Sequence, residues 1–381
     1  MKLSFVIYSY FPYGGQQRDF MRILNECLSR GHQVDVYTLR WEGEVPAGVT
    51  VHRAAVSAFT RTSLYKKFSR WLDAKLAQSA TSYVVGFNKM PGLSIYYAAD
   101  PCFLEMAQEQ RPAYYRYTPR YKHFSGYEAA VLGEESNTEV LYLSAQQYSA
   151  FTKYYPTSKN RLHALPPGLA EDRKLDDRSS EGRRQRKLIA RRSLNAEFQI
   201  AEDATLILQI GSGFKVKGVD RALKAIAALP KEMRDSSHYL LVGSDKPRVY
   251  LALAKRLGIA ERVTIAGGRD DVPSLLAAAD LMLHPAYRES AGYTLLEAIV
   301  AGLPVLATAT CGYACHIKQA DAGVVCDEPI TQTSINEALD MTLRALPTSS
   351  WSENGLAYGA DENLFRMPQV AVDFIEQFTK N

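Results

Sequence analysis

The sequence predicts an α/β protein with two domains, each built on a parallel β-sheet. At 381 residues the chain is long for one domain and comfortable for two. In both halves, apolar runs of strand length alternate with segments of helical periodicity, which is typical of βαβ units. This periodicity breaks at Pro166-Pro167-Gly168, a signal for a domain boundary. We therefore expect one domain over residues 1–166, a second over 167–362, and a final amphipathic helical segment over 363–381.

Composition indicates a soluble globular protein without a disulfide framework. Hydrophobic content of 46% and charged content of 23% are ordinary values that allow a sizeable core. A net charge of +4 is mild, so any basic surface for a partner must be local. The five cysteines are odd in number and scattered, which favours a reducing compartment. Cys311, Cys315 and His316 have no second ligand pair at matching spacing, so we expect no metal site.

The N-terminus leads directly into an apolar strand, without a charged n-region, a long apolar segment or a cleavage site. We therefore expect no signal peptide. An uninterrupted run of about 18 apolar residues, which a transmembrane helix needs, does not occur. The expectation is a cytoplasmic protein that could still lie on a membrane surface.

Residues 1–60 predict a βαβ unit. A strand over residues 3–8 is followed by a glycine-bearing loop, a helix over about 16–30 and a second strand over 33–38. Gly14-Gly15 stands at the strand-to-helix turn, where backbone amides can approach a phosphate. A tight turn explains the glycine pair equally well.

Two later strands end in polar residues. The run that starts at Val84 leads into a loop with Asn88 and Lys89, and the strand Tyr96–Asp100 ends in a carboxylate. Ligands of open parallel sheets bind at the carboxyl ends of strands, so these side chains are candidates for binding. The alternative for Asp100 is a solvated loop residue or the cap of the next helix. Residues 139–144 and 161–165 predict the closing strands of the first domain.

The segment over residues 103–132 combines basic and tyrosine side chains. Between Arg111 and Phe124 it has no acidic residue. Its basic residues are Arg111, Arg116, Arg120 and Lys122, and its tyrosines are Tyr114, Tyr115, Tyr117 and Tyr121. Tyrosine favours wet apolar boundaries, and each nearby cation attracts anionic lipid by about 1 kcal/mol. We predict an anionic membrane surface as the partner; a nucleic-acid surface and a packed aromatic helix are the alternatives.

A basic run over residues 173–192 follows the boundary, and we expect most of it to be the solvated face of a helix. Arg173, just after the Pro-Pro-Gly turn, could instead point at a phosphate. The second domain begins with a strand over 205–210 and a loop that contains Gly213 and Lys217. The loop lacks the third glycine of a dinucleotide-binding fingerprint. A lysine at a helix N-terminus suits a leaving diphosphate.

The stretch from His284 to Thr308 carries the strongest signal. An apolar strand precedes it, a helix follows Gly292, and a further strand begins at Val305. The backbone amides of Ala291, Gly292 and Tyr293 start that helix, where a diphosphate fits. Earlier in the chain, the turn with Gly267, Gly268 and Arg269 is expected to approach a nucleotide base.

Glu289 and Glu297 lie eight residues apart across this loop and helix. If all eight residues were helical, the two Cα atoms would be about 12 Å apart at ~1.5 Å per residue. That exceeds the roughly 5–9.5 Å of a glycosidase acid/base pair. The spacing suits two ends of one extended ligand, a sugar and a ribose joined by a diphosphate. The alternative is a helix start with Glu289 near its N-cap and Glu297 solvated.

This stretch is similar to the E-x7-E region of the family 4 retaining glycosyltransferases, which are two-domain enzymes of the GT-B fold. The matching positions are Pro285, Glu289, Gly292, Glu297, Gly302, Pro304 and Val305. Lys217-Gly218-x-Asp220 also matches the phosphate-binding signature of the family. One departure is Ala291, where an aromatic residue often precedes the glycine. The resemblance implies two Rossmann-like domains facing a cleft, with a C-terminal helix that crosses back to the first domain.

The resemblance also implies roles for individual residues. Glu289 would lie by the donor sugar, Glu297 would bind the ribose, and Lys217 and Arg173 would neutralise the diphosphate. Further residues are expected to bind the donor together with these four. They are Gly14, Gly15, Asp19, Gly213, Arg269, Ala291, Gly292 and Tyr293. The histidine that many members place in the first domain is not found here, which leaves Asp100 as a positional candidate for catalysis on the acceptor side.

A closer resemblance, to the lipopolysaccharide-core glucosyltransferases, covers nearly the whole chain. It is carried by YFPYGGQQRDFMRI, VGFNKMPGL, YYAAD, LPPG, GSGFKVKGVDR and HPAYRESAGYTLLEA. It implies transfer of glucose from UDP-glucose to the 3-OH of inner-core heptose, with retention and without a metal or other cofactor. It places the enzyme on the cytoplasmic face of the inner membrane, with residues 103–132 as the contact. The alternatives are another UDP-hexose or acceptor, a nucleotide-sugar epimerase, and a non-enzymatic basic binder.

Overall fold

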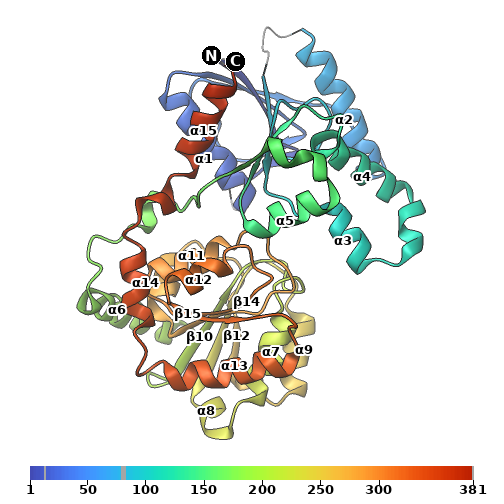
Figure 1. The fold of residues 1–381 in the computed structure, drawn as a ribbon. Coiled ribbons are helices and arrows are strands. Elements are labelled where there is room, and N and C mark those ends of the chain that lie inside the picture. Colours follow the sequence, from blue (N-terminus) through green and yellow to red (C-terminus); the bar gives the residue numbers. More distant parts are fainter. Residues whose placement is uncertain (13, 79–82, 380–381) are drawn as a thin grey trace. The chain divides into compact units, whose positions relative to one another are not determined.

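The protein divides into two compact units in the computed structural model, which describes residues 1–12, 14–78 and 83–379. Unit 1 consists of Met1–Gly168 and Phe365–Asn381, and unit 2 consists of Leu169–Leu364. Each unit is built around one parallel sheet, as the alternation of strand and helix patterns predicts (Figure 1). The last helix of the chain belongs to unit 1.

In the described part of unit 1, seven parallel strands form a sheet in the order β5-β3-β1-β6-β7-β8-β9. The strands are β1 (Lys2–Val6), β3 (Gln33–Thr38), β5 (Val49–Arg53), β6 (Val84–Gly86), β7 (Ile95–Ala98), β8 (Glu139–Tyr142) and β9 (Leu162–Ala164). A separate two-stranded sheet pairs β2 (Ser9–Tyr10) with β4 (Arg40–Trp41). The strand order reverses between β1 and β6. Such a switch point leaves a crevice at the carboxyl ends of the two strands, where ligands bind in open α/β sheets.

The described helices of unit 1 are α1 (Gly15–Ser29), α2 (Arg61–Leu76), α3 (Phe103–Gln110), η1 (Ala113–Tyr117), α4 (Pro119–Leu132), α5 (Ala145–Tyr154), η2 (Pro156–Arg161) and α15 (Met367–Phe378). Three of them, α2, α4 and α5, begin at a side chain that caps their first turn. The side chain of Thr118 accepts the N–H of Tyr121 at the start of α4, and Pro119 occupies the first helical position. The chain therefore breaks between η1 and α4.

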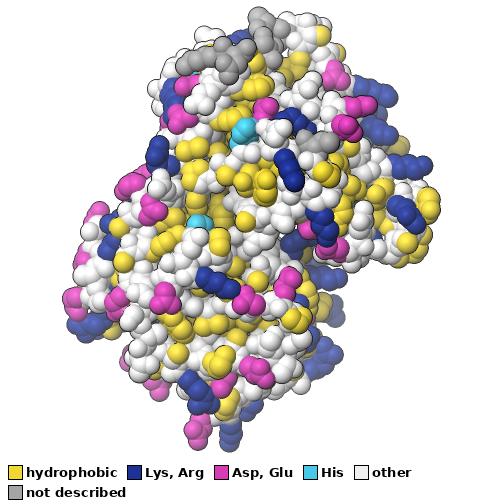
Figure 2. Space-filling model, in the orientation of Figure 1, with side chains coloured by type: hydrophobic (Ala, Val, Ile, Leu, Met, Phe, Trp, Pro, Cys, Tyr) yellow, Lys and Arg dark blue, Asp and Glu magenta, His cyan; other side chains and the backbone are white. Residues whose placement is uncertain are grey.

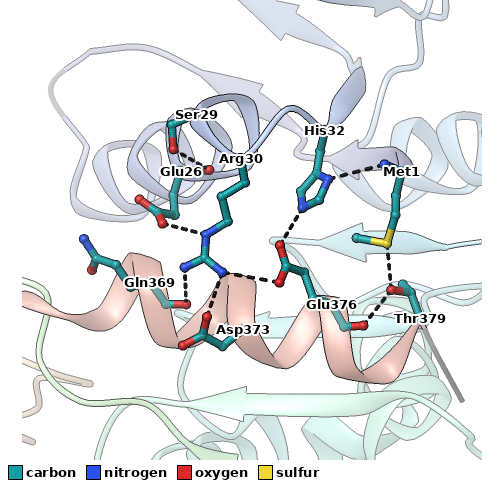
Figure 3. Close-up of polar contacts among 9 residues, drawn as sticks. All are labelled: Met1, Glu26, Ser29, Arg30, His32, Gln369, Asp373, Glu376 and Thr379. Carbon is teal, nitrogen blue, oxygen red and sulfur yellow. Dashed lines mark hydrogen bonds and ion pairs between the residues drawn. The ribbon is translucent and has the colours of Figure 1, made fainter.

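The C-terminal helix α15 packs along α1, and Figure 3 shows the polar contacts that join them. Arg30 donates to Asp373 at 2.7 Å and to the backbone oxygen of Gln369 at 3.3 Å, and it also pairs with Glu26 at 2.8 Å. His32 Nε2 lies 2.8 Å from Glu376. One guanidinium thus joins two helices that are more than 300 residues apart in the sequence.

Replacing Arg30 by alanine is expected to lower the free energy of unfolding by about 1–2 kcal/mol, because one substitution removes a whole charge network rather than an isolated surface pair. Chemical denaturation followed by circular dichroism measures this change. Arg344→Ala is the matched control, since it removes one exposed pair with Asp340 on a single helix and should cost much less. A loss no larger than that of the control would contradict the role of Arg30.

In unit 2, all of which the structure describes, six parallel strands run in the order β12-β11-β10-β13-β14-β15. The strands are β10 (Thr205–Ile210), β11 (Ser237–Val242), β12 (Val263–Ile265), β13 (Leu281–His284), β14 (Val305–Thr308) and β15 (Gly323–Cys326). Counted within the unit this is the order 3-2-1-4-5-6 of the doubly wound dinucleotide-binding fold. Its switch point lies between β10 and β13, so the loops after these two strands are the expected ligand site.

Helices cover both faces of this sheet (Figure 1). They are α6 (Ser180–Phe198), α7 (Val219–Ala228), α8 (Lys231–Asp235), α9 (Arg248–Arg256), α10 (Val272–Ala278), α11 (Tyr293–Val300), α12 (Ala314–Gln319), α13 (Gln332–Ala345) and α14 (Trp351–Tyr358), with short turns η3 (Glu171–Arg173), η4 (Ala260–Arg262) and η5 (Glu362–Phe365). Along β10, Leu206 and Leu208 enter one hydrophobic core and Ile207 enters the other. The strand is therefore apolar on both faces, as its uninterrupted apolar run predicts.

The expectation of a solvated basic helix near the domain boundary is only partly correct. In α6, Arg183 is buried and donates to the backbone oxygens of Ala277 and Ala279 at 2.6 and 3.1 Å. Arg191 donates to the backbone oxygen of Ala278 and pairs with Asp280. Burial lowers the pKa of Arg183 to about 10. These guanidinium groups satisfy carbonyls at the end of α10, so part of the basic run joins α6 to the core.

None of the helices within residues 1–12, 14–78 and 83–379 combines the length and the apolar character needed to cross a membrane. The membrane-contact prediction for residues 103–132 therefore concerns a surface and not a span.

Candidate active site

Two loops meet at the switch point of unit 2. The loop after β10 contains Lys217, and the loop after β13 contains Glu289. The backbone N–H of Tyr287 donates to the oxygen of Val216 at 2.8 Å, which joins the two loops directly. The fold therefore brings together a cation and a carboxylate that are 72 residues apart, at the place where sheets of this order bind ligands.

Close approach of the two loops depends on Gly218. Its φ is +69°, and a Cβ atom at this position would lie 2.0 Å from the backbone oxygen of Pro285. Only glycine fits both the left-handed backbone and the contact. Gly213 in the same loop also has positive φ, at +77°, but a Cβ there would meet no atom within 4 Å.

Gly218→Ala is expected to destabilise unit 2 by about 2–4 kcal/mol, because backbone strain of about 1–2 kcal/mol is added to a clash with a backbone atom. Gly213→Ala is the matched control and should lose only the strain, about 1–2 kcal/mol. Thermal unfolding of both variants separates the two contributions. Equal losses would show that the contact with Pro285 is not needed.

The backbone of Glu289 is held on both sides. Its N–H donates to the oxygen of Thr310 at 3.1 Å, and its carbonyl accepts the N–H of Gly312 at 3.0 Å. The carboxylate forms an ion pair with Lys217 through Oε2. The same oxygen lies 3.3 Å from Nε2 of His284, the last residue of β13.

Electrostatics at this pair are set by burial. Burial lowers the pKa of the Lys217 ammonium to about 8. His284 is fully buried. Burial, together with the nearby charge of Lys217, lowers the pKa of His284 to about 3, so the ring is neutral at physiological pH.

The structure also pairs Arg173 with Glu297. Arg173 ends η3, and its Nε lies 3.3 Å from Oε1 of Glu297 on α11; both side chains are largely buried. Gly292, with φ +103°, precedes this helix, whose first backbone N–H groups have no intrahelical acceptor. The arrangement presents two cations, two carboxylates and a helix N-terminus. These groups can bind a diphosphate flanked by hydroxyl-bearing sugars.

Arg269 is placed in a different group of charges. It donates to Asp271 at 2.7 Å and to Glu197 at 3.0 Å, and both carboxylates raise the pKa of its guanidinium. Its contact with a nucleotide base stays a prediction.

In unit 1, several predicted ligand residues have partners within the fold. Asp19 is buried and accepts the hydroxyl of Tyr97 at 2.7 Å and a guanidinium N–H of Arg22 at 2.5 Å. Burial raises the pKa of Asp19, and the charge of Arg22 opposes this shift. Gly14 and Gly15 lie at the start of α1, where a Cβ on Gly14 would meet the side chain of Gln17. Contact of these residues with the donor also stays a prediction.

Asn88 and Lys89 have similarly local partners. The amide oxygen of Asn88 accepts the N–H of Tyr8 at 2.8 Å, which joins the loops after β1 and β6. Lys89 pairs with Glu128, a fully buried carboxylate on α4 that also accepts the N–H of Leu104 at 2.9 Å. The Lys89 ammonium also donates to the backbone oxygen of Pro101 at 2.6 Å, directly after Asp100.

Asp100 lies just beyond the carboxyl end of β7. Its backbone oxygen is 3.4 Å from the amide nitrogen of Gln147. Burial raises the pKa of Asp100, and the charge of Lys89 opposes this shift. Sequence reasoning gave no role to Glu128 or His284. The sequence signal that could have found them is a polar residue at a core position: Glu128 in a helix pattern and His284 at the end of a strand pattern.

Among the described residues, no group of three or more His, Cys, Asp and Glu side chains is arranged to hold a metal ion.

Comparison with known proteins identifies the family. A family model described as glycosyl transferases group 1 matches residues 190–354. Lipopolysaccharide glucosyltransferase WaaG of Escherichia coli K12 is 42% identical over 376 residues, which cover 98% of both chains. The chain belongs to the group 1 glycosyl transferases. It is a hexosyltransferase enzyme, and the predicted similarity to lipopolysaccharide glucosyltransferases is confirmed.

Solved structures of these glycosyltransferases confirm the predicted fold class. A crystal structure of WaaG matches with a TM-score of 0.89 at 41% identity, covering 98% of this chain and 99% of that one. A structure of Anabaena Alr3699/HepE in complex with UDP-glucose matches with a TM-score of 0.69 at 17% identity, over 99% of this chain and 100% of that one. The second match shows a shared fold alone. The two parallel-sheet units are those of the GT-B architecture.

Proposed function

We propose that this glycosyltransferase moves glucose from UDP-glucose to the 3-OH of an inner-core heptose of lipopolysaccharide, with retention of configuration and without a metal. The observation that carries the proposal is the Lys217–Glu289 pair at the switch point of unit 2. It occurs in a chain that is 42% identical to WaaG over nearly its full length.

On the donor side, the diphosphate of UDP-glucose binds beside Lys217 and the N-terminus of α11. Lys217 then exchanges the Glu289 carboxylate for phosphate oxygens, and Arg173 adds a second cation. The bond between glucose C1 and the phosphate oxygen breaks, and its electron pair passes to the diphosphate. The 3-OH oxygen of the heptose forms the new bond to C1, and its proton passes to the departing diphosphate. Fixed cations stabilise the charge that develops there. Glu289 orients the sugar and Glu297 binds the ribose, which supplies the positioning that the transfer needs.

On the acceptor side, the heptose binds at the carboxyl ends of the strands in unit 1. Asp100 is the candidate residue for contact with the acceptor hydroxyl, because it follows β7 at that edge of the sheet. Lys89 holds the backbone just after Asp100, so the loop is fixed from within unit 1.

Release of UDP from UDP-glucose tests this proposal. The assay is run with EDTA, in the presence and absence of a heptose-terminated core acceptor. We expect release that depends on the acceptor and continues with EDTA present. Analysis of the product by NMR then gives the linkage and the anomeric configuration.

Parallel reactions with UDP-galactose and UDP-N-acetylglucosamine test the choice of donor. No release from any of the three donors would overturn the proposed donor class. Acceptor-independent conversion of one UDP-sugar into another would favour an epimerase.

We further propose that the enzyme lies on the cytoplasmic face of the inner membrane through the surface of η1 and the start of α4. The side chains of Tyr114 and Tyr117 are 72% and 70% exposed, and Arg111, Arg116 and Arg120 are exposed beside them. In Figure 2, basic and hydrophobic side chains lie next to each other at the edge of unit 1 where Figure 1 places α3 and α4. Such a surface suits anionic headgroups, with aromatic rings at the interface.

Neutralising Arg116, Arg120 and Lys122 together by glutamine is expected to weaken binding to anionic vesicles about 100-fold, since each cation contributes about 1 kcal/mol. Co-sedimentation with phosphatidylglycerol vesicles measures the change. The matched control neutralises three exposed residues of α9, Arg248, Lys255 and Arg256, and should bind nearly as the parent does. Equal losses in both triple variants would mean that net charge, and not this surface, drives binding.

A further inference from the structure

The carboxylate of Glu289 is oriented by two contacts that share one oxygen. Lys217 and His284 both contact Oε2, and neither contact uses Oε1. Because Thr310 and Gly312 fix the backbone of Glu289, the remaining freedom is rotation of the side chain. The pair of contacts on Oε2 limits that rotation and leaves Oε1 as the oxygen that can accept a substrate hydroxyl.

The ring of His284 is built into the sheet. His284 ends β13, pairs in register with Ala307 of β14, and is fully buried. Nε2 lies 3.3 Å from Oε2 of Glu289. Because an ionised carboxylate only accepts hydrogen bonds, a hydrogen bond between these two atoms requires the ring proton on Nε2. Within the described residues, Nδ1 has no hydrogen-bond partner. A buried polar atom without a partner costs free energy, which indicates that this position is not optimised for stability alone.

We propose that His284 is a positioning residue for Glu289, whose neutral Nε2–H keeps the carboxylate in place when Lys217 changes partners. The inference rests on the proposed donor role of Glu289. In the empty site both His284 and Lys217 engage Oε2. Once the ammonium of Lys217 binds the donor diphosphate, Glu289 loses its contact with Lys217 and keeps the hydrogen bond from His284.

The neutral state of the ring is essential to this role. A charged histidine would bring a second cation next to Lys217 and would attract the diphosphate itself. An apolar side chain would leave the carboxylate free to rotate once the ammonium leaves. A neutral donor avoids both outcomes, because it holds an anion by a hydrogen bond without adding charge.

Two substitutions of His284 separate positioning from packing. His284→Met keeps an apolar side chain of similar length but has no donor, whereas His284→Gln can present an amide N–H near the place of Nε2. We expect His284→Met to lower kcat about 100-fold, as for a displaced catalytic group, while KM for UDP-glucose changes less than about threefold. His284→Gln should stay within about fivefold of the parent.

The pH profile gives a readout that a packing role would not change. In His284→Met the acid limb of kcat/KM should move to higher pH, because Glu289 loses a donor that favours its ionised form. The proposal would be overturned if the glutamine and methionine variants lost kcat equally and the acid limb of the kcat/KM profile of His284→Met stayed at the pH of the parent. A fully active methionine variant would also overturn it.

An NMR measurement on the parent protein tests the contact without relying on activity. Nitrogen-15 spectra of histidine-labelled protein distinguish the Nε2–H tautomer, the Nδ1–H tautomer and the charged ring, and His284→Gln assigns the resonance. We expect a neutral Nε2–H ring from about pH 5 to pH 8. A charged or Nδ1–H ring would overturn the positioning role, whatever the activity. If the spectra show the expected tautomer but the protein does not transfer glucose, the contact with Glu289 stands and the proposed function is rejected.

Discussion

Replacing Glu289 by alanine is expected to lower kcat for glucosyl transfer by about 100- to 1000-fold while the protein remains folded. The carboxylate contacts the cation proposed for the diphosphate through Oε2, and the contacts with Lys217 and His284 do not use its Oε1. Its side chain lies at a loop and not in the core, so its loss should leave the sheet of unit 2 intact. Initial rates of transfer to a heptose-terminated acceptor measure the effect, and circular dichroism checks the fold.

Glu289→Gln refines this test, because the amide has the same shape but lacks the charge. We expect it to lose nearly as much activity as the alanine variant. Glu337→Gln, on the exposed side of α13, is the control and should retain full activity. A fully active or unfolded alanine variant would reject the role given to Glu289.

Binding of UDP is expected to weaken as the pH rises through about 8, by close to tenfold per pH unit above that value. The pKa of Lys217 is about 8 because the ammonium is buried, so its charge is present below this pH and is lost above it. A diphosphate binds the charged form, and binding should therefore be accompanied by proton uptake near pH 8 and above. Isothermal titration calorimetry in buffers of different ionisation enthalpy, between about pH 7 and pH 9, measures both quantities.

Two variants of Lys217 test whether this group causes the pH dependence. Lys217→Arg keeps a charge that does not titrate in this range, so its affinity for UDP should be independent of pH. Lys217→Met should bind UDP at least about 100-fold more weakly, as expected for loss of a charged partner of phosphate, again without pH dependence. If the methionine variant keeps the parent's pH dependence, another group is responsible.

Much of the fold could be predicted from the sequence because buried parallel strands are continuous apolar runs. The predicted strand at 205–210 has the same bounds in the structure. The predicted helix at about 16–30 is α1, Gly15–Ser29. Strand order is a property of tertiary pairing, so the switch point between β10 and β13 could not be derived from periodicity.

The sequence allowed the residues of the candidate site to be predicted, but not the contacts between them. Lys217 and Glu289 each stood in a recognisable motif, yet their ion pair follows from two loops that meet across a switch point. Arg173 and Glu297 were likewise expected on one ligand, and in the structure they pair with each other. In an empty site, opposite charges that would bind one ligand can neutralise each other.

Residues outside these motifs were harder to interpret because burial is decided by distant parts of the chain. Asp19 could have faced a ligand, but Tyr97, 78 residues away, binds its carboxylate. Arg183 looked like part of a solvated face, but backbone oxygens about 95 residues away accept its guanidinium. His284 headed the strongest motif and received no role, since a sequence does not distinguish a buried neutral histidine from an exposed one.

A crystal structure of the protein with UDP bound tests the central claim most directly. We expect the diphosphate at the switch point of unit 2, with Lys217 Nζ moved from Glu289 to a phosphate oxygen, Glu297 on the ribose, and His284 Nε2 still on Oε2 of Glu289. UDP bound at another place, with the Lys217–Glu289 pair unchanged, would contradict the account.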